Sequence, residues 1–182
     1  MRITSGTLRG RPIEPPKDRQ VRPTSDKLRQ AIFNILTSRD AVGGAYVMDL
    51  CCGTGALGFE ALSRGCEDVV LIDQHPTSLA LAKQNAKSLG VEGQCSFFKA
   101  DCRKLPERPA HIAPRSLVFF DPPYKQELIT PGLLGLISQN WLADGAYVVC
   151  ETEKGSPFIV PEGYRLELER TYGDSEIKII AR

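Results

Sequence analysis

The chain has 182 residues, a formal net charge of +1 and 42% hydrophobic residues, which fit one domain with a buried core and exclude a disordered tail. No run approaches the roughly 18 apolar residues that a membrane helix needs. The N-terminus also lacks the apolar stretch of a signal peptide. We therefore expect a cytoplasmic protein with no membrane partner.

The six cysteines form no C-x-x-C pair, and most lie in or beside apolar segments. Free cysteine is often buried as a small apolar residue, and cytosolic cysteines are usually reduced. We interpret them as core residues and expect no metal site.

Charge is unevenly distributed along the chain. Residues 1–40 contain nine Lys and Arg against four Asp and Glu, a net charge of +5, which leaves −4 for the remaining 142 residues. A basic end on a slightly acidic body is typical of a protein that holds a polyanion at that end, and a solvated arm is the alternative. Residues 7–12 could form a small hairpin, with turns near Gly6 or Gly10. Such a hairpin is too short for a core of its own and must dock elsewhere.

The predicted elements alternate between helices and strands. Thr24 or Ser25 can cap a first helix that extends to residue 36, with apolar residues at helical spacing. The further elements, in chain order, are a buried strand at 45–50, a helix at 56–63, a strand at 68–73, a helix at 78–89, strands at 94–99 and 117–121, a helix at 128–138, a turn at 141–145, and strands at 146–151, 165–171 and 176–181. This order indicates an α/β fold with a mostly parallel sheet covered on both faces and a terminal antiparallel hairpin.

Four aspartates fall at or just past strand ends: Asp49, Asp73, Asp101 and Asp121. Right-handed crossovers put those ends at one edge of the sheet, so the four carboxylates are expected to line one crevice. A glycine turn follows the first strand, at the place where nucleotide-like ligands bind in such sheets. For any one aspartate alone, a helix cap is the alternative.

The turn Gly53-x-Gly55-x-x-Gly58 matches the dinucleotide fingerprint, and Asp73 lies twenty residues after Gly53, which would suit NAD. Asp49 argues against NAD, because a pyrophosphate would rest at the helix N-terminus near this like charge. A ligand with ammonium and sulfonium groups and a free ribose, such as S-adenosylmethionine, fits better. The expected contacts are Asp49 at the methionine end, Asp73 at the ribose hydroxyls and Asp101 at the adenine amine.

A second motif, Asp121-Pro122-Pro123-Tyr124, follows the strand at 117–121. The two prolines remove two N–H donors, so carbonyls and the carboxylate remain to accept hydrogens from an exocyclic amine. Accepting both hydrogens would localise the amine lone pair and aim it at a methyl group, while the tyrosine offers a surface on which a base stacks. The alternative is a rigid turn.

Together the two motifs resemble a class I S-adenosylmethionine-dependent amino-methyltransferase. The N-terminal sequence resembles a narrower group, the bacterial 16S rRNA guanine-N2 methyltransferase family (RsmD type). The residues that carry this likeness are Arg2-Ile-x-x-Gly6-x-x-Arg9-Gly-Arg11, Arg22-Pro-Thr-x-Asp26-x-x-Arg29-x-x-Ile-Phe33-Asn34, Gly58-x-Glu60-Ala-Leu-Ser-Arg-Gly65 and Trp141-Leu142.

The resemblance implies a Rossmann-like fold of seven strands, with an N-terminal hairpin at 1–23 that meets RNA and a catalytic domain at 24–182. It also implies methylation of one guanine N2 in 16S rRNA of the small ribosomal subunit or its assembly intermediate, and we expect a monomer. The residues it assigns are Asp49, Gly53, Gly55, Asp73, Asp101 and Thr24 for the cofactor, Asp121, Pro122, Pro123 and Tyr124 for the amine, and Arg2, Arg9, Arg11 and Arg22 for RNA.

The sequence departs from the family pattern at one place, and two alternative functions stay open. Cys51-Cys52 stands where the family usually has a bulky residue followed by Ala or Ser. The amine motif also occurs in enzymes that methylate adenine N6 in DNA, so that activity stays open, as does a non-catalytic RNA-binding module.

Overall fold

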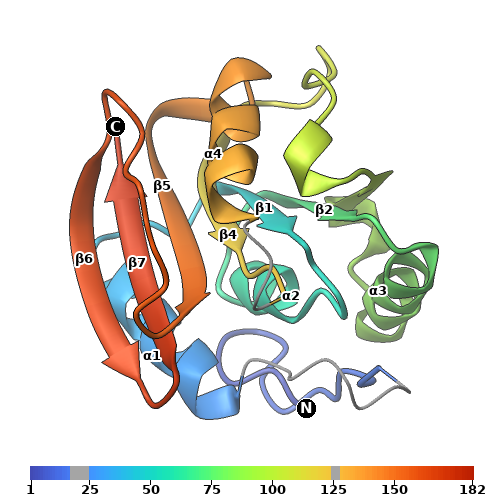
Figure 1. Ribbon diagram of the computed structural model, residues 1–182. Helices are drawn as coiled ribbons and strands as arrows, with labels where there is room; N and C mark the ends of the chain where they lie inside the picture. The colour runs from blue at the N-terminus through green and yellow to red at the C-terminus, as the bar shows by residue number, and fades with distance from the viewer. Residues whose placement is uncertain (17–24, 124–127) are drawn as a thin grey trace.

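A computed structural model describes residues 1–16, 25–123 and 128–182 of the chain (Figure 1). The predicted alternation of helices and strands is confirmed. The elements are α1 (Asp26–Thr37), β1 (Tyr46–Leu50), α2 (Ala56–Ser63), β2 (Asp68–Asp73), α3 (Pro76–Leu89), η1 (Glu92–Gln94), β3 (Cys95–Lys99), η2 (Cys102–Lys104), β4 (Arg115–Phe120), α4 (Ile129–Ser138), β5 (Leu142–Glu153), β6 (Arg165–Tyr172) and β7 (Ser175–Ala181).

The strands form one seven-stranded sheet in the order β3-β2-β1-β4-β5-β7-β6. Strands β1 to β5 pair in parallel, and β7 runs antiparallel to both β5 and β6. The predicted terminal antiparallel hairpin is therefore confirmed. The order reverses between β1 and β4, which lie side by side. Such a switch point opens a crevice at the carboxyl ends of the strands, and this is where ligands bind in open α/β sheets.

Each face of the sheet packs against its own core. Val47 and Phe119 lie in a cluster with α1, α2 and α3, whereas Met48 and Phe120 lie in a second cluster with η2 and α4. Successive strand residues point to opposite faces, so strands covered on both sides are apolar throughout. The acids at the strand ends therefore leave the sheet next to buried apolar residues.

The predicted turn at 141–145 is wrong, because β5 already begins at Leu142. Leu142 pairs with Arg115 of β4, and the register shifts before Leu117. Trp141 is fully buried; its carbonyl accepts the Arg115 N–H at 2.7 Å, and its ring N–H donates to Pro106 at 2.8 Å. These long-range contacts override the local turn signal of Asp144-Gly145.

The N-terminal residues dock on the body of the protein, as predicted, but the expected hairpin is reduced to a single bridge between Arg2 and Pro12. Ile3 and Ile13 are buried in the core beside α2. Gly6 has a φ of 83°, and a Cβ there would lie 1.7 Å from the Ser63 carbonyl oxygen, so only glycine permits this close approach. Among the residues that the structure describes, no helix is long and apolar enough to span a bilayer.

Candidate functional site

A cavity of about 1320 Å³ opens at the carboxyl ends of the parallel strands. It brings together most of the residues that the two motifs predicted: Asp49, Gly53, Asp73, Asp101, Asp121, Pro122 and Pro123. Gly55 does not line it. Thr24, Arg22 and Tyr124 lie outside the described residues.

Asp49 lies at the base of this cavity and is only 2% exposed. Its Oδ2 accepts the Gly58 N–H at 2.9 Å, in the first turn of α2. Burial raises the pKa of Asp49 to about 7; the Gly58 bond opposes the rise, and the charge of Asp73 adds to it. The N-terminus of α2 is thus already bonded to a carboxylate, which disfavours a phosphate at that place.

Gly58 permits this contact because it lets α2 approach β1 closely. A Cβ at Gly58 would lie 2.9 Å from Val69 and 3.4 Å from the Asp49 side chain. Gly55 serves packing as well, since a Cβ there would lie 2.5 Å from the Phe59 ring. These two glycines of the fingerprint therefore shape the turn and the helix contact rather than the cavity wall.

Asp73 ties the glycine turn to the next helix. Its Oδ2 accepts the Gly53 N–H at 3.0 Å, and its Oδ1 accepts the His75 N–H at 2.8 Å at the start of α3. Each oxygen keeps further lone pairs for a ligand hydroxyl. The carboxylate is thus held at the strand end that the sequence predicted for a ribose contact.

Asp101 is engaged by a neighbour on its own turn. Arg103 approaches Asp101 with Nε at 3.0 Å from Oδ1 and Nη2 at 2.6 Å from Oδ2, and the Arg103 N–H caps the same carboxylate at 2.9 Å. These bonds lower the pKa of Asp101. A ligand amine at this position would share the carboxylate with a guanidinium.

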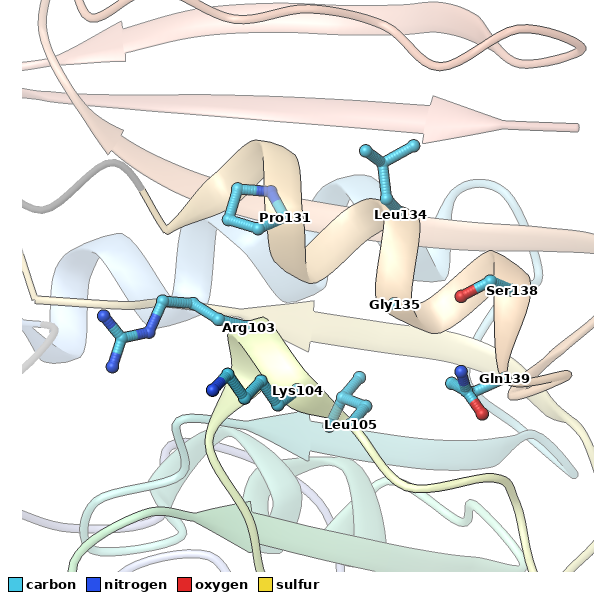
Figure 2. Close-up of a pocket in the computed structure, with 8 residues that line it drawn as sticks. All are labelled: Arg103, Lys104, Leu105, Pro131, Leu134, Gly135, Ser138 and Gln139. Carbon is cyan, nitrogen blue, oxygen red and sulfur yellow. The ribbon is translucent and has the colours of Figure 1, made fainter.

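Arg103 also lines a second, smaller cavity of about 320 Å³ between η2 and α4. Figure 2 shows Pro131, Leu134 and Gly135 of α4 on one side of it and Arg103, Lys104 and Leu105 on the other. None of the predicted site residues lines this space, so the large cavity is the candidate site.

Several lining residues were missed by the sequence reasoning. Glu151, at the end of the predicted fifth strand, follows the same strand-end rule as the four aspartates and could have been found by it. Glu14 and Pro15, which follow the docked N-terminal residues, carry no local signal. Cys51 and Cys102 both line the cavity, and their thiols are hydrogen-bonded to each other.

The predicted RNA contacts that the structure describes lie outside the cavity. Arg2, Arg9 and Arg11 are all exposed on the N-terminal extension. Arg2 donates to the Gly10 carbonyl at 2.8 Å, and Arg11 donates to the Ser88 carbonyl on α3. Two of the three arginines are thus bonded to backbone carbonyls, one within the extension and one on α3.

Comparisons with known proteins show which proteins the chain resembles. The family model described as Conserved hypothetical protein 95 matches residues 1–181. Ribosomal RNA small subunit methyltransferase D of Haemophilus influenzae is 33% identical over 181 residues, which cover 95% of this chain and 89% of that protein. The Escherichia coli protein of the same name is 32% identical over 184 residues, which cover 100% of this chain and 90% of that protein.

Solved structures share the fold over most or all of the chain. The putative methyltransferase yhhF from Escherichia coli superimposes with a TM-score of 0.84 at 28% identity, covering 100% of this chain and 97% of that chain. An RNA methyltransferase from Salinibacter ruber in complex with S-adenosyl-L-homocysteine has a TM-score of 0.65 at 19% identity, covering 88% of this chain and 93% of that chain.

Proposed function

The chain belongs to the Conserved hypothetical protein 95 family of small-subunit ribosomal RNA methyltransferases, and we propose that the base it methylates is a guanine, at the exocyclic N2 amine. It is a methyltransferase that acts on ribosomal RNA of the small subunit, and its methyl donor is S-adenosylmethionine. One observation carries the proposal: the acids of the glycine-turn motif and the segment Asp121-Pro122-Pro123 line a single cavity.

The chemistry of the lining residues fits S-adenosylmethionine. Carboxylates at three strand ends suit a ligand with cationic groups and ribose hydroxyls, and Asp49 occupies the helix N-terminus that a pyrophosphate would need. When bound, the cofactor supplies an electrophilic methyl group on a sulfonium. We assign Asp49 to the methionine end, Asp73 to the ribose and Asp101 to the adenine amine.

Asp121 and Pro122 would hold the reacting amine. An amine conjugated to a base ring is a poor nucleophile, because its lone pair is delocalised into the ring. Accepting its two hydrogens on the Asp121 carboxylate and the Pro122 carbonyl localises that pair and orients it. Positioning and electrostatics then supply the rate, and no strong base is required.

The N-terminal extension would hold the RNA. Arg2, Arg9 and Arg11 are exposed there, and guanidinium groups bind phosphates well. We assign residues 1–23 to RNA contact and residues 24–182 to the catalytic domain. We also propose that the active form is a monomer.

The test uses tritiated S-adenosylmethionine with three substrates: small ribosomal subunits lacking their native guanine-N2 methylation, naked 16S rRNA, and DNA. The labelled nucleoside is identified after digestion. We expect N2-methylguanosine from the subunits. N6-methyladenine from DNA would replace the guanine proposal, and the absence of label in every pool would contradict it.

Substitution of Asp121 tests whether this residue serves the reacting amine or the cofactor. We expect Asp121→Ala to abolish methyl transfer and to leave the Kd for S-adenosylmethionine within a few fold, as measured by calorimetry. A loss of cofactor binding instead would reassign Asp121 to the cofactor half of the site.

A further inference from the structure

Glu151 stands next to the amine site and belongs to none of the motifs. It lies in β5, is 7% exposed, and lines the same cavity as Asp121. The β4–β5 register pairs Phe120 with Cys150, so Glu151 is the next residue of β5 and Asp121 directly follows the end of β4. Neighbouring strands lie about 4.8 Å apart.

Both carboxylates line the cavity at this end of the sheet. Phe119 and Val149, each two residues earlier, pack in the core cluster of α1, α2 and α3. Because side chains alternate along a strand, Glu151 is directed to that same side, and Asp121, which directly follows β4, lines the same cavity. A base whose amine lies against Asp121 therefore has Glu151 beside it.

The Glu151 carboxylate is oriented by the C-terminal hairpin. The Ser175 hydroxyl donates to its Oε1 at 3.0 Å, and Ser175 is itself 4% exposed. Tyr172 and Gly173 of the same hairpin also line the cavity. A carboxylate offers about four acceptor positions on its two oxygens, so it can serve more than one donor at a time.

The bases differ at the atom that this carboxylate would meet. Guanine presents two neighbouring donors on one edge, the N1–H and the N2 amine. Adenine presents its amine next to N1, which carries a lone pair and no hydrogen. A second carboxylate beside the amine site attracts the guanine edge and repels the adenine edge.

We propose that Glu151 is the residue that selects guanine, by accepting the N1–H while Asp121 accepts the N2 amine. This inference rests on the proposed guanine-N2 activity and assigns its specificity. Sites built to hydrogen-bond a substrate reject analogues that leave the site's polar group unpaired, often by factors of about 10⁴. We expect the wild type to favour guanine over a base that lacks the N1–H by at least about 100-fold in kcat/KM.

The experiment uses 2-aminopurine, which keeps the reacting amine and carries a lone pair at N1. Once the methylated position is known, small subunits are reconstituted with guanine or 2-aminopurine at that position. We expect the wild type to prefer guanine in kcat/KM and Glu151→Gln to reduce this preference at least tenfold. The Gln amide can donate to N1, and its oxygen can still accept from Ser175.

Glu153→Gln is the matched control, because it makes the same change two residues along β5 and Glu153 does not line the cavity. It should keep the wild-type preference. Melting temperature and S-adenosylmethionine affinity are measured for each variant. If wild-type protein fails to methylate guanine, the proposed function fails; the present inference is judged only on the base preference.

Two results would overturn the role of Glu151. One is an unchanged preference for guanine in folded Glu151→Gln; the other is equal loss of activity on both bases. If Glu151→Gln does not fold, Glu151→Asp decides the matter, since it keeps the charge and shortens the reach by one methylene. We expect that variant to lose at least tenfold in kcat/KM on guanine with cofactor affinity unchanged, and full activity would refute the proposal.

Discussion

The side-chain amide of Asn85 pairs with the backbone of Glu14 in both directions. The Glu14 N–H donates to Asn85 Oδ1 at 2.9 Å, and Asn85 Nδ2 donates to the Glu14 carbonyl at 3.2 Å. The same Nδ2 donates to the Thr54 carbonyl at 3.1 Å, inside the glycine turn. Asn85 is 1% exposed on α3. One buried amide therefore joins the N-terminal extension to the turn, and both line the cavity.

We predict that Asn85→Asp weakens cofactor binding. A carboxylate cannot donate, so the carbonyls of Glu14 and Thr54 lose their donor and face a buried negative charge, at a cost of about 1–3 kcal/mol. We expect the Kd for S-adenosylmethionine to rise by about tenfold, which corresponds to about 1.4 kcal/mol. Calorimetry measures it, with Asn34→Asp on the exposed face of α1 as the control. An unchanged Kd would show that the turn keeps its shape without Asn85.

Cofactor affinity should depend on pH through Asp49. Burial raises the pKa of Asp49 from 3.8 to about 7, and a cationic ligand favours the ionised form. We therefore expect the affinity for S-adenosylmethionine to rise with pH up to about 7 and then to level off, approaching a tenfold change per unit below that pH. Titrations between pH 5.5 and 8.5 measure this. Asp49→Asn should bind more weakly and lose the pH dependence, and a parallel pH curve in that variant would assign the titration elsewhere.

The same pKa has the opposite consequence for folding. Between about pH 4 and pH 7 the folded protein keeps a proton on Asp49 that the unfolded chain releases. The contribution of Asp49 to the free energy of unfolding should therefore fall as pH rises through this window and stay level above it. Denaturant unfolding of the wild type and Asp49→Asn at pH 5 and pH 7 isolates the effect, because the variant lacks it. If the free energy of unfolding of the wild type, relative to that of Asp49→Asn, does not fall between pH 5 and pH 7, the raised pKa of Asp49 is contradicted.

The strand-end acids could be predicted from the sequence because parallel strands bring their carboxyl ends to one edge, so position along the chain fixes position in the cavity. Asn85 could not, since its partners lie 71 and 31 residues away and a polar residue in a helix carries no mark of them. Trp141 is a third case: only its burial against Pro106 and Arg115 turns a local turn signal into the start of β5.

Cys102 should be the most reactive thiol of the cavity. The hydrogen bond with Cys51 lowers the pKa of Cys102 and raises that of Cys51, and the thiolate is the reactive form. We expect iodoacetamide to modify Cys102 first, S-adenosylhomocysteine to protect it, and the modified protein to lose cofactor binding. Peptide mass spectrometry measures the labelling. Cys150, whose pKa burial raises to about 12, is the internal control. Equal labelling with and without ligand would contradict this placement.

Glu60 fastens the N-terminal extension to the body of the protein. This fully buried carboxylate of α2 accepts the Thr4 N–H at 2.8 Å, the Thr4 hydroxyl at 2.7 Å and the Ser5 N–H at 3.1 Å. It also pairs with Arg64 at 2.9 Å and with the buried Arg29 at 3.4 Å. Five donors from three segments thus converge on two oxygens.

We predict that Glu60→Gln destabilises the protein by about 1–3 kcal/mol, because the amide removes the buried counter-charge of Arg29 and leaves this guanidinium with the partly exposed Asp26. Hydrogen exchange should rise most in residues 1–14, and the affinity for 16S rRNA should fall with it, since Arg2, Arg9 and Arg11 lie on the loosened segment. Glu67→Gln makes the same change at an exposed site just beyond α2 and should alter neither quantity. If Glu60→Gln loses stability but keeps wild-type RNA affinity, the docked extension is a structural element and the RNA is held elsewhere.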